Sequence, residues 1–117
     1  MVKKDNKTYS IAYLQSVKTS PLKVTRVTGA VTGMKASDAV KYLSFCNLKM
    51  AVYIKSLILS ALSNAENNHN MDIDELYVAK FDIGKAFTLK RLATRARGRS
   101  SRILKRFSNV RVYLAEK

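Results

Sequence analysis

One stretch near the C-terminal end limits the possible folds more than any other. The segment "KRLATRARGRSSRILKR", from Lys90 to Arg106, holds eight basic residues and no acidic one. Such a stretch can bury almost nothing of its own, so it should lie outside the core. Strand-like patterns precede and follow it, at residues 76–83 and 109–114. The simplest connection between two such strands is a β-hairpin whose arms continue past the core.

The length of this stretch predicts a long hairpin. Each arm has about twelve residues, and at roughly 3.3 Å per residue it would reach about 40 Å. If the arm is extended, Arg95, Arg97 and Arg99 share one face, and Gly98 with the serines after it marks a possible tip. Ordering a free arm of this kind is costly. We therefore expect it to be mobile alone and to be ordered by a partner.

The remaining sequence predicts a small α+β body. Residues 8–17 alternate as a strand, and 20–33, 37–45 and 48–68 read as helices. Ser20 before Pro21 is typical of a helix start, and Gly33 of a helix end, while Ser37 is the expected cap of the second helix. Residues with the spacing of a buried face recur along the third helix: Met50, Ala51, Ile54, Leu57, Ile58, Ala61, Leu62 and Ala65.

Both faces of the strand at 76–83 carry apolar residues, which a β-bulge would explain, whereas Val110, Val112 and Leu114 share one face of the last strand. We therefore expect three helices packed on a small three-stranded antiparallel sheet, with a long extended basic β-hairpin. This is one domain over residues 1–117, with a body at about 8–83 and 108–115 and a protruding hairpin at about 84–107.

The charge balance indicates a polyanionic partner. The chain has 22 Lys and Arg against 8 Asp and Glu, a net charge of +14, of which +10 falls between Ile83 and Ala115. Nucleic acid is the first candidate, since guanidinium groups bind phosphates through paired hydrogen bonds. An acidic membrane surface is the second, but neither an amphipathic helix of the required kind nor an apolar run of about 18 residues is present.

Catalysis and metal binding are weakly supported. The chain has one cysteine, Cys46, and one histidine, His69, which excludes a zinc site of four cysteines or of two cysteines and two histidines. A nuclease could hold a metal through His69 with Asp72, Asp74 and Glu75. In a turn before a strand, however, such carboxylates more often cap or face water, and no triad or phosphate loop accompanies them. We expect no enzyme activity, no cofactor and no metal.

Two further interpretations compete with the hairpin scheme. Three helices and a basic hairpin also occur in winged-helix DNA-binding proteins, but the third helix has only Lys49 and Lys55 and ends in Glu66, which suits a DNA groove poorly. Alternatively, the basic stretch is a solvated loop without a role. Apolar residues that partly alternate with the bases argue against that, and they are Phe87, Leu89, Leu92, Ile103, Leu104 and Phe107.

The hairpin residues also carry a family resemblance. Lys90, "RARGR" from Arg95 to Arg99, and "NVRVYL" from Asn109 together resemble the L22 family of bacterial large-subunit ribosomal proteins. "NAENN" (64–68), "DIDELYV" (72–78) and the start of the first helix (20–23) are also similar, so the resemblance covers roughly residues 8–115. Thr94 stands where the family often has Pro, and Arg26 lies one step later than usual.

The resemblance implies a structural protein of the large ribosomal subunit. Its body would lie on the subunit surface and bind large-subunit rRNA, and its hairpin would line the polypeptide exit tunnel and aid assembly. The implied partners are rRNA, neighbouring large-subunit proteins and the nascent polypeptide, with no membrane and no homo-oligomer. The implied location is the cytoplasmic ribosome rather than an organellar one.

The site residues follow from this resemblance and from the charge pattern. The expected rRNA-binding residues are Lys23, Arg26, Lys85, Lys90, Arg91, Arg95, Arg97, Arg99, Arg102, Lys105, Arg106 and Arg111. The expected tunnel-lining tip is formed by Arg91, Leu92, Ala93, Thr94, Arg95, Ala96, Arg97 and Gly98.

Overall fold

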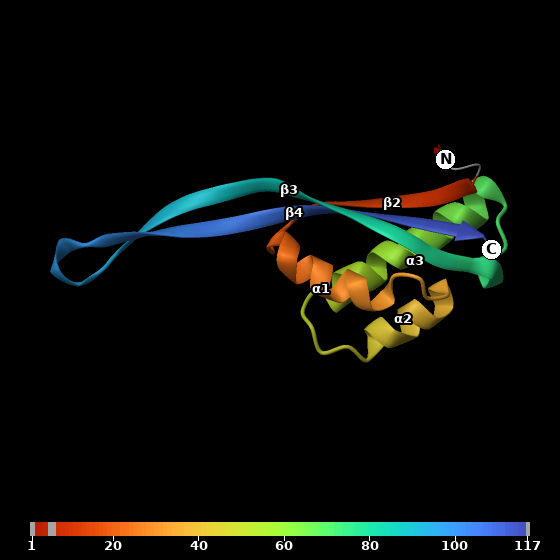
Figure 1. Cartoon of the computed structure of the whole chain (residues 1–117), viewed down its shortest axis with the longest axis horizontal. Helices are drawn as coiled ribbons and strands as arrows, with labels where there is room; N and C mark the ends of the chain where they lie inside the picture. Colours follow the sequence, from red (N-terminus) through yellow and green to blue (C-terminus); the bar gives the residue numbers. More distant parts are fainter. Residues whose placement is uncertain (1, 5–6, 117) are drawn as a thin grey trace.

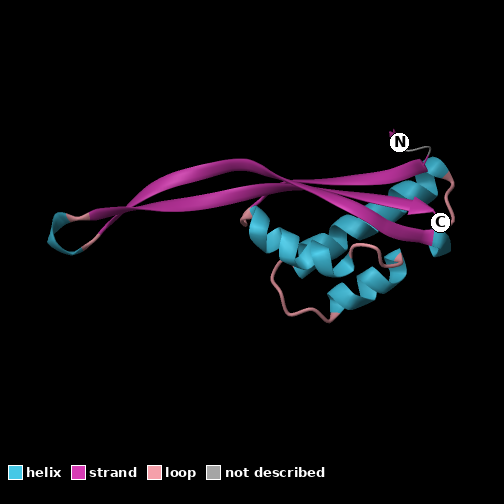
Figure 2. Cartoon of the chain, in the orientation of Figure 1, coloured by secondary structure: helices cyan, strands magenta, loops and turns pink. Residues whose placement is uncertain are grey.

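A computed structural model describes residues 2–4 and 7–116, and an antiparallel sheet runs through its whole length (Figure 1). The strands are β1 (Val2–Lys4), β2 (Lys7–Val17), β3 (Leu76–Thr94) and β4 (Ser100–Glu116), and the helices are α1 (Pro21–Val31), α2 (Ala36–Ser44) and α3 (Ala51–His69). Short 3₁₀ turns occupy Ile73–Glu75 and Ala96–Gly98. The molecule measures 62 × 29 × 22 Å, because β3 and β4 continue far beyond the helices (Figure 2).

The sheet has the order β1-β2-β4-β3, with every pair antiparallel. The predicted α+β class is confirmed, with the three predicted strands, the three helices and the extended hairpin. The short edge strand β1 is an addition that the sequence did not predict. It pairs with the start of β2, where Val2 lies opposite Tyr9.

Helix α3 forms the centre of the core. Of its eight predicted inward residues, seven are buried and Leu62 is partly buried. Two polar bonds fix α3 on β2: the Ser10 hydroxyl donates to the Ala61 carbonyl at 2.8 Å, and the Asn64 amide donates to the Ile11 carbonyl at 3.0 Å. The predicted inward face of β4 is confirmed, since Val110, Val112 and Leu114 are fully buried.

The predicted helix caps are partly wrong. Ser20 precedes α1 as expected, but its side chain makes no capping hydrogen bond. Lys35 holds the cap position of α2, so Ser37 lies inside that helix. Gly33 has the expected left-handed backbone, with φ +89°. Its amide donates to the Val78 carbonyl at 2.8 Å, which ties the end of α1 to the edge of the sheet.

A β-bulge in β3 explains the mixed pattern of that strand. The pairing with β4 shifts between Val78 and Lys80. Before the shift Val78 faces the helices, and after it Phe81 and Ile83 pack against the same core. One extra residue therefore moves the inward set from even to odd positions. The bulge that the sequence suggested is confirmed.

Candidate nucleic-acid interface

A second bulge separates the hairpin, residues 84–107, from the body, which is the rest of the described chain. The register of β3 against β4 shifts between Lys85 and Thr88. At this point the rings of Phe87 and Phe107 stack, with centroids 4.3 Å apart. This ring pair is the apolar contact at the base of the hairpin, and beyond it β4 is exposed from Ser100 to Arg106.

Basic side chains of the arms lie opposite aliphatic ones. Four consecutive cross-strand pairs have this composition: Leu89–Lys105, Lys90–Leu104, Arg91–Ile103 and Leu92–Arg102. Like charges directly opposite each other would repel, and here none meet in these four pairs. Because successive residues alternate in direction, Lys90 and Arg102 lie on one face while Arg91 and Lys105 lie on the other. Both faces of the hairpin therefore present cations beside apolar surface.

The tip of the hairpin is a tight turn. Residues Ala96–Gly98 form a 3₁₀ turn, and the Arg95 amide donates to the Arg99 carbonyl across it. Arg97 and Gly98 both have left-handed backbones, with φ of 60° and 71°. The expectation that Arg95, Arg97 and Arg99 share one face of an extended arm is therefore wrong. They are spread around a turn, because this tight reversal places Arg97 and Gly98 consecutively at positive φ.

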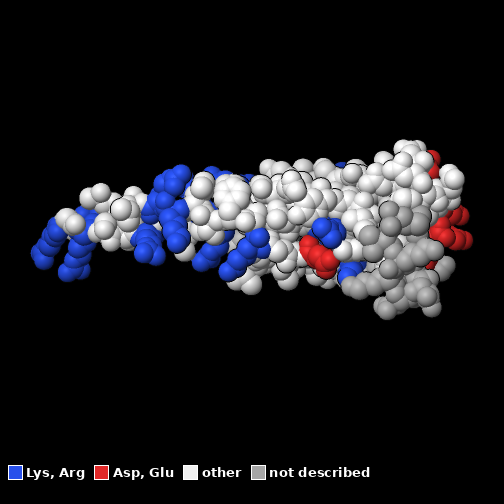
Figure 3. Space-filling view, turned by 90° about the horizontal axis from the view of Figure 1, so that it is seen from above, with Lys and Arg blue, Asp and Glu red and all other residues white. Residues whose placement is uncertain are grey.

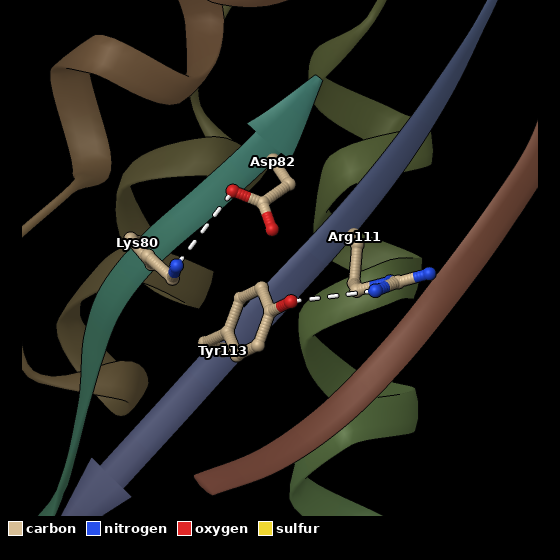
Figure 4. Close-up of polar contacts among 4 residues, drawn as sticks. All are labelled: Lys80, Asp82, Arg111 and Tyr113. Carbon is tan, nitrogen blue, oxygen red and sulfur yellow. Dashed lines mark hydrogen bonds and ion pairs between the residues drawn. The ribbon is translucent and has the colours of Figure 1, made fainter. Parts of the chain in front are cut away.

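The cations of the hairpin have no acidic ion-pair partner among the side chains that the structure describes. Among residues 9–116, whose side chains are described, the structure contains one ion pair, between Lys80 Nζ and Asp82 Oδ1 at 3.8 Å, and it lies in the body (Figure 4). In the view of Figure 3, blue side chains follow the hairpin to its tip, and red ones are confined to the body, most at the end remote from the tip. The hairpin is thus an uncompensated cationic surface, suited to a polyanion.

The first helix adds cations at the base of the hairpin. Lys23 lies beside Lys105 and Arg106 in one surface groove, and Lys23 and Arg26 line a neighbouring cleft. The structure therefore joins predicted residues of α1 and of the hairpin into a continuous basic surface. Two further cations, Lys18 and Lys49, belong to this surface and were not predicted as site residues. Their positions beside Lys23 depend on tertiary packing, and no local pattern marks them.

Arg111 lies apart from this surface, on the outer face of β4. Its guanidinium donates to the Tyr113 hydroxyl at 3.4 Å (Figure 4). The guanidinium also lies 5.0 Å from the centre of the Tyr13 ring. The hydrogen bond to the Tyr113 hydroxyl raises the pKa of Arg111 above its ordinary value. Asp82 is its cross-strand neighbour. Arg111 is therefore held by two tyrosine side chains of the body.

The alternative sites obtain little support. Asp72 accepts a hydrogen bond from the Asp74 amide at 3.0 Å, so it caps the 3₁₀ turn, as capping carboxylates do. No three His, Cys, Asp or Glu side chains are grouped to hold a metal within the described residues. Helix α3, the candidate DNA-reading helix, packs between the sheet and α2. Over the same described residues, every helix is too short or too polar to cross a membrane.

The chain is similar in sequence to a known protein family. Residues 12–115 match the family model described as "Ribosomal protein L22p/L17e". A relative from Rhizorhabdus wittichii, named large ribosomal subunit protein uL22, is 44% identical over 107 residues, covering 92% of this chain and 84% of that protein. The protein of the same name from Rickettsia akari is 41% identical over 113 residues, covering 97% and 95%. The chain therefore belongs to the ribosomal protein L22p/L17e family.

Proposed function

We propose that this chain is a non-catalytic structural component of the bacterial large ribosomal subunit. It binds large-subunit rRNA and supports assembly, with the body on the surface of the particle and the hairpin inserted between rRNA segments. Neighbouring ribosomal proteins complete its surroundings, and it acts as a single copy. Support comes from the names of its relatives and from the acid-free hairpin.

The single observation that carries the proposal is the two-sided hairpin. A protein that lies on top of a nucleic acid needs cations on one face only. Here Lys90 and Arg102 occupy one face and Arg91 and Lys105 the other. A hairpin enclosed by RNA on both sides would use all four, and the aliphatic side chains between them would exclude water from the packed surfaces.

The twelve predicted rRNA-binding residues remain the proposed contacts, with Lys18 and Lys49 added to them. Arg91 to Gly98 form the proposed tunnel-lining tip, where the nascent polypeptide would pass. Because the contacts are mainly to phosphates, binding should weaken steeply with salt, by about 0.7–0.9 in the log–log slope for each contact.

Crosslinking the chain in cells and sequencing the bound RNA tests this function directly. The expected product is large-subunit rRNA, with contacts on segments that are distant in the RNA sequence. Crosslinks to DNA or to messenger RNA alone would contradict the proposal.

A charge-removal experiment tests the role of the tip. Replacement of Arg95, Arg97 and Arg99 by Ala should lower the salt slope of rRNA binding by about 2–3 and reduce incorporation into large subunits, while the free chain stays folded. The matched control removes the same charge from the helical side, as Lys35→Ala, Lys41→Ala and Lys55→Ala. Equal losses in both triple variants would show that net charge, and not the tip, determines binding.

A further inference from the structure

A cleft at the base of the hairpin combines a cationic rim with an apolar floor. It has a volume of about 320 Å³ and lies between the start of α1, the end of β2 and the loop that joins α2 to α3. Figure 1 shows that loop running back from the end of α2 towards α1 and the start of α3. Its lining residues are Lys18, Thr19, Lys23, Arg26, Val27, Leu48, Lys49 and Met50.

The floor of the cleft is apolar and fixed in place. Val27 and Met50 are 2% and 5% exposed and belong to the main core, and Leu48 packs against that core. The wall is held by the Ser108 hydroxyl, which donates to the Thr19 carbonyl at 2.7 Å. The floor is therefore preformed, and the volume falls at the small end of the range for ligand pockets.

The rim carries four exposed cations and no acid. Lys18, Lys23, Arg26 and Lys49 project from three separate segments around the opening, and none of them has an ion-pair partner among the described residues. A continuous RNA duplex would use such cations but would leave the apolar floor empty. A nucleotide turned out of its stack supplies both a base for the floor and phosphates for the rim.

We propose that this cleft holds one unpaired nucleotide of the RNA, with its base against Val27 and Met50 and its flanking phosphates on the four cations. This inference rests on the proposed rRNA binding and specifies what one part of the surface recognises. Lys18 and Lys49 then act in a site next to the base of the hairpin, and Arg26 is placed to stack its guanidinium on the base.

The test compares two short RNA duplexes that differ in one feature. One contains a single-nucleotide bulge, supplied as a mixture of the four nucleotides, and the other is fully paired. The full chain, with its methionine methyl groups labelled with ¹³C, is titrated with each. Met50→Leu, which keeps the volume of the floor, assigns the Met50 signal. A base stacked on this methyl group should shift its resonance upfield with the bulged RNA only.

Affinity provides the second measurement. The bulged duplex should bind about tenfold tighter than the paired one, within the range that one stacked base contributes. The double variant Lys23→Ala, Lys49→Ala should abolish that preference. Lys35→Ala with Lys41→Ala, which removes the same charge outside the cleft, should keep it.

The outcomes separate this inference from the proposed function. Equal affinities for both duplexes and no Met50 shift would overturn the nucleotide site and show a simple phosphate-binding surface, while rRNA crosslinks in cells would still support the ribosomal role. A Met50 shift of equal size with inorganic phosphate would also overturn it, because no base would then be required.

Discussion

Strands β3 and β4 pass through two regions that are stabilised in different ways. In the body their inner face is covered by helices, and Val78 and Val112 are fully buried. In the hairpin the same two strands pair with equal regularity, yet β4 is exposed at every position from Ser100 to Arg106. Backbone pairing is common to both regions, so burial of apolar side chains is what distinguishes them. A two-stranded ribbon without such burial is marginal in water.

The largest expected difference between the hairpin and the body is in the free energy of local unfolding. Amide hydrogens in the hairpin of the free chain, such as that of Ile103, should exchange with almost no protection. Those of α3, such as that of Ile58, should be protected by about 5 kcal/mol or more, near the global stability of a small domain. Hydrogen exchange measured by NMR gives both values. Bound rRNA should slow exchange in the hairpin. Strong protection of the hairpin in the free chain would contradict the claim that the two regions are stabilised differently.

An identical substitution in each region sharpens the comparison. Ile58 is fully buried in α3, so Ile58→Ala should lower the free energy of unfolding by about 2–5 kcal/mol through lost contacts and a cavity. Ile103 is 40% exposed in the hairpin, and Ile103→Ala should cost about 0.5 kcal/mol or less. Urea denaturation of the two variants measures both. Similar losses would mean that the hairpin is part of the core.

The smallest expected effect concerns the boundary between the regions. Ser108 is fully buried and its hydroxyl bonds to the Thr19 carbonyl, so Ser108→Ala should lower the free energy of unfolding by about 1 kcal/mol. Ser101→Ala in the exposed hairpin is the matched control, and it should stay within about 0.5 kcal/mol of the parent chain. Denaturation curves of both variants decide this. If Ser101→Ala and Ser108→Ala lowered the free energy of unfolding equally, Ser108 would not mark the boundary between the body and the hairpin.

Much of the body was predictable because its signals are periodic. The buried face of α3 follows directly from residue spacing, and the mixed apolar pattern of β3 correctly indicated a bulge. Features set by tertiary packing were not predictable. The cap of α2 shifted from Ser37 to Lys35.

The candidate site divides in the same way. The cations of the hairpin could be identified from composition, because residues 84–107 hold nine basic residues and no acidic one, which indicates a polyanionic partner. The cleft could not, since tertiary packing brings residues 48–50 beside residues 18–27, far from them in the sequence. Gly98 and the serines after it correctly indicated the tip. The left-handed backbone of Arg97 was not predicted, because an alternating sequence is compatible with an extended arm until the chain has to reverse.

The two bulges show that the direction of each side chain in the hairpin depends on whether the number of extra residues is odd or even. Both extra residues lie in β3, which spans 19 residues where β4 spans 17. Adding or removing one residue along the outer arm of β3 would exchange its two sides, so that the side chain of Lys90 would point where that of Arg91 points now. Adding or removing two residues would leave each side chain on its original face. The direction in which each guanidinium reaches its surroundings is therefore encoded in a residue count, and a designer who lengthens this arm should do so in steps of two.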